Sequence, residues 1–174
     1  MKSVKDYIIS IPDFPSKGII FRDVTSVLES PEGYALAIDE LNKLLDGVDY
    51  DLIAGTESRG FIFGAPLAYM NKKGFIPVRK KGKLPRETVE MSYDPEYGSA
   101  TIEIHKDAIK PGDKVVLVDD LIATGGTIQA AAKLVEELGG EVVKMIFLIE
   151  LTDLGGRKLL EGYDVASVVQ YEGE

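Results

Sequence analysis

Apolar residues recur at helical spacing in several stretches of the chain. In residues 34–45 they stand at every third or fourth position, which predicts an amphipathic helix. Ser30 and Pro31 fit an N-cap followed by a proline at the first helical position, and Gly47 fits a stop. Further helices are predicted over about residues 61–71 and 127–138, the second closed by two glycines at 139–140.

Short apolar runs alternate with these helices and predict buried strands. The run at residues 114–118 is rich in β-branched residues, which is typical of a strand covered on both faces. Similar runs stand at residues 52–54, 75–78, 142–149 and 165–169. Strands that alternate with helices predict an α/β fold with a mostly parallel central sheet. No repeat or linker divides the 174 residues, so we expect a single domain.

Residues 79–98 show no sustained periodicity of apolar positions. They hold glycines, prolines and charges, between segments near 90–93 and 101–104 that could pair as strands. We interpret this stretch as a mobile hairpin or long loop, because such a segment in a compact domain is usually functional or disordered. The stretch begins with five cations within eight positions, namely Arg79, Lys80, Lys81, Lys83 and Arg86. They could bind an anionic ligand, and the alternative interpretation is a basic loop in solvent.

Composition narrows the chemistry. Twenty Lys and Arg against 29 Asp and Glu give a net charge of −9, which disfavours non-specific contact with nucleic acids or anionic membranes. The chain has no cysteine and one histidine, which argues against thiol chemistry, a Ser-His-Asp triad or a multi-histidine metal site. No apolar stretch reaches the roughly 18 residues of a membrane span, so we expect a cytoplasmic protein. His105 is expected to face solvent, with Ile102 and Ile104 facing the core.

The most informative segment follows the strand at 114–118. Two carboxylates, Asp119 and Asp120, stand at its end, and a loop of small residues then opens into a helix. Ligands bind at this end of the strands in open α/β sheets, and free amides at a helix N-terminus attract anions. The segment therefore predicts a phosphate cradle, with the aspartates able to bind sugar hydroxyls or a hydrated Mg²⁺. The alternative is a plain strand-to-helix turn with Asp120 as a solvated cap.

Two other phosphate-binding motifs are absent. No two glycines are separated by a single residue, so the dinucleotide fingerprint G-x-G-x-x-G cannot occur. Gly55 and Gly60 have the spacing of a Walker loop, but Phe61 and Ile62 stand where that loop requires Lys and Ser or Thr.

Residues 119–127 resemble the 5-phosphoribosyl diphosphate (PRPP) signature of the type I phosphoribosyltransferase family. Four further stretches resemble the members of that family that use adenine: the base-binding hood at 12–15 and 18–25, the diphosphate loop at 57–61, the flexible catalytic loop at 79–85 and 92–98, and the closing residues 170–172. The resemblance covers about residues 8–172. It implies the type I phosphoribosyltransferase fold, with a hood over about 8–30 and a catalytic loop over about 79–98.

The resemblance also implies an activity, namely transfer of a phosphoribosyl group from PRPP to adenine, giving AMP and diphosphate with Mg²⁺ as cofactor. A homodimer is the family expectation. Two alternatives remain: a phosphoribosyltransferase for another base, and a PRPP-sensing regulator without catalysis. Such a regulator would need a DNA-binding segment, for which 174 residues leave no obvious room, and the net charge of −9 does not favour contact with nucleic acid.

Each implied role falls on a residue of this chain. The acid–base group is Glu96, with a solvated loop carboxylate as the alternative, and Tyr97 would assist loop closure. Phe21 would contact adenine or belong to the core of the hood. The implied sets are, for ribose and phosphate, Asp119, Asp120, Ala123, Thr124, Gly125, Gly126 and Thr127; for diphosphate, Glu57, Ser58, Arg59, Arg79, Lys80 and Lys83; for adenine, Ile20, Phe21 and Arg22; and for catalysis, Glu96, Asp119, Asp120 and Arg59.

Overall fold

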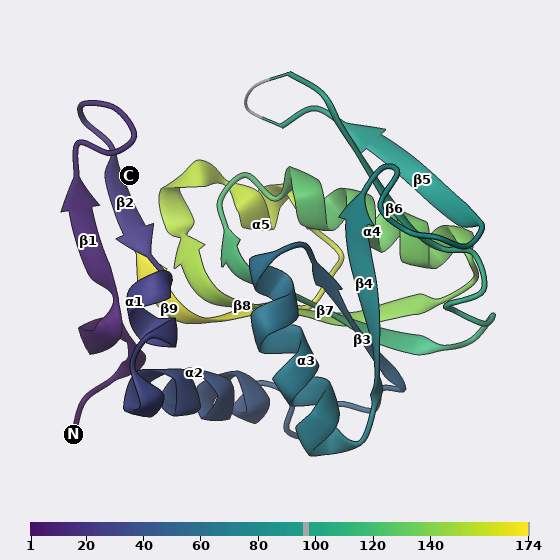
Figure 1. Ribbon diagram of the computed structural model, residues 1–174, viewed down its shortest axis with the longest axis horizontal. Helices are drawn as coiled ribbons and strands as arrows, with labels where there is room; N and C mark the ends of the chain where they lie inside the picture. The colour runs from purple at the N-terminus through teal and green to yellow at the C-terminus, as the bar shows by residue number, and fades with distance from the viewer. Residues whose placement is uncertain (96–97, 174) are drawn as a thin grey trace.

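The structure is a computed structural model that describes residues 1–95 and 98–173. Seven strands form one sheet in the order β5-β6-β4-β3-β7-β8-β9, and β1 pairs with β2 in a separate ribbon (Figure 1). Five neighbouring strands of the large sheet are parallel, and β5 and β6 join antiparallel at one edge. The parallel strands are β3 (Leu52–Thr56), β4 (Gly74–Lys80), β7 (Lys114–Ile122), β8 (Glu141–Leu151) and β9 (Val165–Tyr171). The prediction of an α/β fold with a mostly parallel sheet is confirmed.

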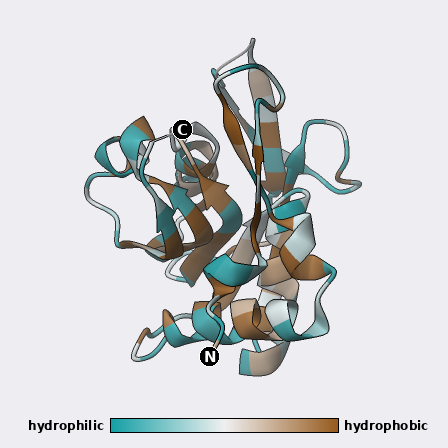
Figure 2. Ribbon diagram, turned by 90° about the vertical axis from the view of Figure 1, so that its left-hand side faces the viewer, coloured by the Kyte–Doolittle hydropathy of each residue, from teal (hydrophilic) through white to brown (hydrophobic). Residues whose placement is uncertain are grey.

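Helices cover both faces of this sheet, which explains the apolar runs of its strands. Along β7, Val116 and Val118 enter one core, which also contains residues of α2 (Pro31–Lys43) and α3 (Arg59–Asn71). Val115 and Leu117 enter a second core, with residues of α4 (Gly126–Glu137). Figure 2 shows the apolar residues concentrated on the central strands and the polar ones in the loops. No helix in the described residues is long and apolar enough to cross a membrane.

Most predicted boundaries lie within about two or three residues of the observed ones, and two of the differences fall at functional places. Ser30 caps α2, since its Oγ accepts a hydrogen bond from Gly33 N at 3.0 Å. Strand β7 runs to Ile122 rather than stopping at residue 118, because the longer β8 pairs with residues 119–122. Asp119 and Asp120 therefore lie within the strand, where their orientations are fixed by the sheet. The helix expected from residue 61 begins at Arg59, so this side chain projects from a helix N-terminus.

The charged stretch 79–98 contains regular structure. Its first two residues end β4, and β5 (Thr88–Tyr93) pairs antiparallel with β6 (Ala100–His105), which confirms the hairpin. The mobility of the stretch stays a prediction.

The prediction that His105 faces solvent is wrong. Its side chain is 7% exposed, and its Nε2 accepts a hydrogen bond from Arg86 N at 3.3 Å. The alternation placed Ile102 and Ile104 correctly in the core. It failed for His105 because the segment between β4 and β5 covers the other face of β6.

The N-terminal ribbon stands at the opposite side of the molecule from the β5–β6 hairpin (Figure 1). Strands β1 (Ile9–Pro12) and β2 (Ile20–Asp23) pair from Ile9 opposite Asp23 to Pro12 opposite Ile20. The short helix α1 (Thr25–Leu28) then leads the chain into α2. The guanidinium of Arg22 lies 4.0 Å from the ring centre of Tyr171 at the end of β9, which fastens the ribbon to the sheet.

Candidate active site

The strand-to-helix segment predicted as a phosphate cradle forms a cavity of about 220 Å³ at the end of β7. Residues 119–128 line it, together with Arg59 from α3 and Phe147 from β8. Helix α4 begins at Gly126 with Gly125 as its N-cap, so no capping side chain covers its first amides. These amides and the positive end of the helix dipole face the cavity, which suits a phosphate group.

Two glycines allow the loop between β7 and α4 to lie close to the start of α5 (Gly156–Leu159). Gly125 has a φ of +89°, and a Cβ there would stand 3.1 Å from the carbonyl oxygen of Gly156. A Cβ on Gly156 would stand 2.7 Å from the carbonyl oxygen of Ala123. The loop is therefore supported from behind by the start of α5, which Arg157 holds through two hydrogen bonds to Glu150 at 2.8 and 2.9 Å. We infer that the close backbone packing fixes the cradle before a ligand arrives.

The two aspartates differ in their surroundings. Asp120 is buried, with 5% of the residue exposed, and its carboxylate accepts a hydrogen bond from Arg59 Nε, with the atoms 2.5 Å apart. Asp119 Oδ1 accepts one from the backbone N–H of Asp120 at 2.8 Å. Burial, and then the negative charge of Asp120, raise the pKa of Asp119 well above its ordinary value. Burial and mutual repulsion therefore destabilise the two charged carboxylates in the free protein. A ligand with positive charge or hydroxyl donors would relieve this destabilisation.

We expect Asp119→Asn to stabilise the free protein by about 1 kcal/mol at pH 7, or about 2–4 °C in Tm. A raised pKa means that the folded state binds the Asp119 proton more tightly than the unfolded chain. The destabilisation caused by ionising Asp119 is therefore absent below the pKa of the unfolded chain, about 4, and grows as the pH rises above it. Thermal unfolding of both proteins between pH 4 and 8 measures this difference. A gain that persists undiminished at pH 4 would contradict the electrostatic explanation.

A second cavity, of about 250 Å³, lies between the ribbon and the end of β7. Phe14 and Phe21 contribute aromatic rings whose centres are 5.2 Å apart, and residues 22–25 complete the hood side. Arg59, Asp120 and Leu121 form the opposite wall, and all three also line the cradle. An apolar pocket therefore adjoins an anion-binding cavity across one shared wall.

The sequence-predicted hood residues lie partly in this pocket. Phe21 and Arg22 line it, but Ile20 is 39% exposed and is not among the lining residues. The side chain of Arg22 donates a hydrogen bond to Ser10 Oγ in the ribbon. Sequence reasoning missed Phe14 and Leu121, although Phe14 stands inside the hood motif and Leu121 directly follows the acid pair.

The predicted diphosphate residues meet between β3 and α3. The carboxylate of Glu57 accepts hydrogen bonds from Arg79 Nε at 3.1 Å and from Lys80 N at 2.9 Å. Burial opposes the charged form of this carboxyl, but these bonds and the charges of Arg79 and Lys83 lower the pKa of Glu57. Glu57 is thus placed to orient cations rather than to contact an anion itself. Ser58 is the N-cap of α3, directly before Arg59.

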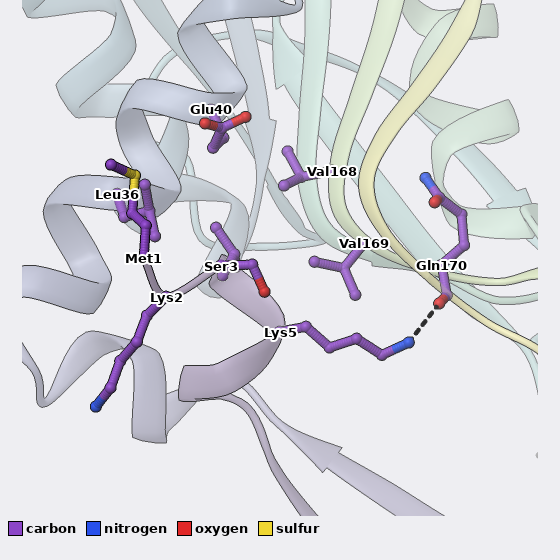
Figure 3. A pocket seen from close by; sticks show the side chains of 10 residues that line it. Met1, Lys2, Ser3, Lys5, Leu36, Glu40, Val168, Val169 and Gln170 are labelled. Atoms are coloured by element: carbon purple, nitrogen blue, oxygen red, sulfur yellow. Dashed lines mark hydrogen bonds between the residues drawn. The ribbon is translucent and has the colours of Figure 1, made fainter.

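A larger cavity, of about 440 Å³, lies near the N-terminus (Figure 3). Residues from the N-terminal segment, α2 and β9 line it, and Lys5 Nζ donates to the Gln170 carbonyl at 3.4 Å. None of the predicted site residues lines this cavity, so its size alone does not make it the candidate site.

Two predicted residues, Glu96 and Tyr97, lie outside the described residues, and their roles stay predictions. Within residues 1–95 and 98–173, no group of three or more His, Asp or Glu side chains is arranged to hold a metal ion.

Known proteins resemble this chain along its whole length. The phosphoribosyl transferase domain family matches residues 23–170. An adenine phosphoribosyltransferase of Agathobacter rectalis is 70% identical over 174 residues, which is 100% of both chains. The chain belongs to the adenine phosphoribosyltransferases.

Solved structures of this family share the fold. The adenine phosphoribosyltransferase of Thermoanaerobacter pseudethanolicus has a TM-score of 0.93 and 56% identity, covering 97% of this chain and 98% of its own. That of Saccharomyces cerevisiae, solved with adenine and an imino-altritol bisphosphate, has a TM-score of 0.88 and 42% identity, covering 95% and 96%. The family expected from the sequence motifs, and the type I phosphoribosyltransferase fold, are confirmed.

Proposed function

We propose that this chain transfers the 5-phosphoribosyl group of PRPP to adenine, with AMP and diphosphate as products. The observation that carries the proposal is the shared wall of Arg59, Asp120 and Leu121 between the phosphate cradle and the aromatic hood pocket. A nucleoside monophosphate has a phosphate at one end and a flat base at the other. Two adjoining cavities of these characters suit the two ends, with the ribose at the shared wall.

The residues of the shared wall, the cradle and the diphosphate loop suit the reaction. The bond between the ribose anomeric carbon and diphosphate breaks, and a bond from that carbon to a ring nitrogen of adenine forms. Positive charge develops on the ribose meanwhile, and the carboxylates of Asp119 and Asp120 would stabilise it and bind the ribose hydroxyls. Arg59, together with Arg79, Lys80 and Lys83, would neutralise the departing diphosphate.

Adenine loses a proton as it bonds to the ribose, and we propose Glu96 as the group that accepts it. Glu96→Gln should lower kcat and spare PRPP binding, because the amide keeps the size of the side chain but cannot take up the proton. Steady-state kinetics with varied PRPP separates the two effects. Unchanged kcat with weakened PRPP binding would remove Glu96 from proton transfer. Tyr97, beside it, would pack against the closed site.

We propose that Mg²⁺ binds with PRPP rather than in a protein cage. The donor set fits this: Asp119 and Asp120 offer adjacent carboxylates, and Mg²⁺ is commonly held by one or two carboxylates plus substrate phosphates and water. When bound, the ion would supply positive charge to the phosphate oxygens and neutralise the leaving group.

We further propose a cytoplasmic homodimer. Two large apolar side chains are exposed at the end of α3, where Tyr69 is 86% and Met70 44% exposed. Nearby on the same helix, Pro66 lines a shallow cavity together with Tyr34 and Ile38 of α2. Exposed apolar surface is typical of an interface. Sedimentation velocity at micromolar concentration measures the assembly state.

The experiment that tests the function is a panel of bases. The purified protein is mixed with Mg²⁺ and PRPP and then, separately, with adenine, hypoxanthine, guanine, xanthine or orotate, and nucleotides are separated by chromatography. We expect AMP from adenine and no product from the other bases. Product from another base would contradict the reading of the hood pocket. Measurable PRPP binding without any product would favour the PRPP-sensing regulator.

A further inference from the structure

A buried carboxylate outside the two cavities holds the basic turn between β4 and β5. Glu103, in the middle of β6, is 4% exposed. One of its oxygens accepts hydrogen bonds from Gly82 N at 3.2 Å and from Leu84 N at 3.1 Å, and the other accepts one from Thr88 Oγ1 at 3.2 Å. Both amides belong to the turn that contains Lys83.

The environment of Glu103 is costly for an ion. Among the described residues no Lys, Arg or His lies within ion-pair distance of its carboxylate. A buried carboxylate without a counter-ion is strongly disfavoured unless hydrogen-bond donors replace its water. Here three donors do so, two of them backbone amides. The cost is offset only while the turn stays in place, so Glu103 and the turn stabilise each other.

A second carboxylate holds the same turn from the side of the cavities. Glu57 accepts from Lys80 N, so that alternate amides of residues 80–84 bond to two different glutamates. Lys83 N donates to the Lys80 carbonyl at 3.3 Å, and Lys80 N donates to the Glu57 carboxylate at 2.9 Å, so the turn with Lys83 adjoins the diphosphate loop. The charge of Lys83 also contributes to lowering the pKa of Glu57. The amides of Gly82 and Leu84, on either side of Lys83, are the ones that Glu103 binds.

We propose that Glu103 is a positioning residue for diphosphate recognition: it fixes the backbone on both sides of Lys83 so that this cation stays directed to the diphosphate loop. The proposal rests on the function proposed above and assigns a determinant of its diphosphate subsite. Glu103 acts through the turn and contacts no ligand. The AMP end of the site, built from β7, α4 and the hood, does not depend on it.

Calorimetric titration with two separate probes, inorganic diphosphate and AMP, tests this role. Glu103→Met keeps an unbranched side chain of similar length but has no strong acceptor for the two amides. We expect its Kd for diphosphate to rise about tenfold or more, which corresponds to losing about 1.4 kcal/mol of binding, with its Kd for AMP unchanged. Glu103→Gln should bind both ligands like the wild type, because its amide oxygen can accept both backbone bonds and its NH2 can donate to Thr88 Oγ1.

Two further variants separate positioning from general loss of stability. Ile104→Val, one residue along β6 in the core, is expected to cost about 1 kcal/mol of stability and to leave both Kd values unchanged. Glu103→Ala replaces the Met variant if the latter does not fold by circular dichroism.

Several results would overturn the proposal. One is an equal rise of the Kd for AMP and the Kd for diphosphate in the Met variant. Another is an unchanged Kd for diphosphate in the Met or Ala variant. A third is a Gln variant whose Kd for diphosphate rises as much as that of the Met variant. A wild-type protein that binds neither probe would instead refute the proposed function, and the positioning role with it. Loss confined to the Glu103 variants leaves that function standing.

Discussion

Replacing both Asp119 and Asp120 by asparagine is expected to lower kcat/KM for the formation of AMP by roughly 10³-fold or more, on the scale of losing the main electrostatic stabilisation of a transition state. Both carboxylates line the cradle, and Asp120 also stands at the wall that the cradle shares with the hood pocket, where the ribose would acquire positive charge. Asparagine keeps the shape of both side chains and removes both charges. Steady-state kinetics with adenine and PRPP measures the effect.

The fold of this double variant should persist, because removal of the buried charge at Asp119 favours the folded state and offsets the loss of the bond from Arg59. The matched control is Asp46→Asn with Asp49→Asn, two exposed carboxylates before β3, at the end of the parallel strands opposite to the site. The control should keep full activity. If the double variant at the site is folded and retains near-normal activity, these carboxylates do not take part in the reaction.

Gly125→Ala is expected to raise the KM for PRPP by about 10- to 100-fold. The added methyl group would displace the backbone of the cradle, whose amides must be correctly placed to bind the phosphate. The new Cβ would stand 3.1 Å from the carbonyl oxygen of Gly156, and the residue would have to keep a φ of +89°. The backbone must therefore shift by a few tenths of an ångström at this contact, and we expect the amides at the start of α4 to shift with it. Kinetics at saturating adenine, with PRPP varied, gives this constant.

Gly112→Ala is the control for the strain. Gly112 has a φ of +90°, nearly the same as Gly125, but open space where its Cβ would lie, and it stands in the turn before β7. Both alanines carry the same cost of a left-handed backbone, so both variants should lose stability through that strain. Only Gly125→Ala should change PRPP binding. Equal KM values for the two variants would show that the contact with Gly156 does not shape the cradle.

The sequence predicted the cradle well because its information is local. An apolar strand, two acids, small residues and a helix follow one another at 114–138, and neighbours in sequence are neighbours in space there. The same holds for the cap of α2 at Ser30. The resemblance of residues 12–25 to a known hood likewise predicted the contribution of Phe21 to the pocket.

The rest depends on contacts between distant segments, which no local pattern contains. His105 and Glu103 are buried because the turn before β5 covers their face of β6, and period-two alternation does not reveal a covering segment. The role of Glu57 was also hidden, since its partners Arg79 and Lys80 stand more than twenty residues away. The length of β7 was underestimated because two aspartates interrupt its apolar run, and the pairing with β8 extends the strand beyond them to Ile122.

A crystal structure of the protein with AMP would show whether the cradle and the hood pocket form one active site. We expect the phosphate at the amides of residues 124–127, the ribose beside Asp119 and Asp120, and the base in the hood pocket with Phe21 and Leu121. AMP with its phosphate elsewhere, or with its base outside the pocket, would contradict the joining of the two cavities into one active site.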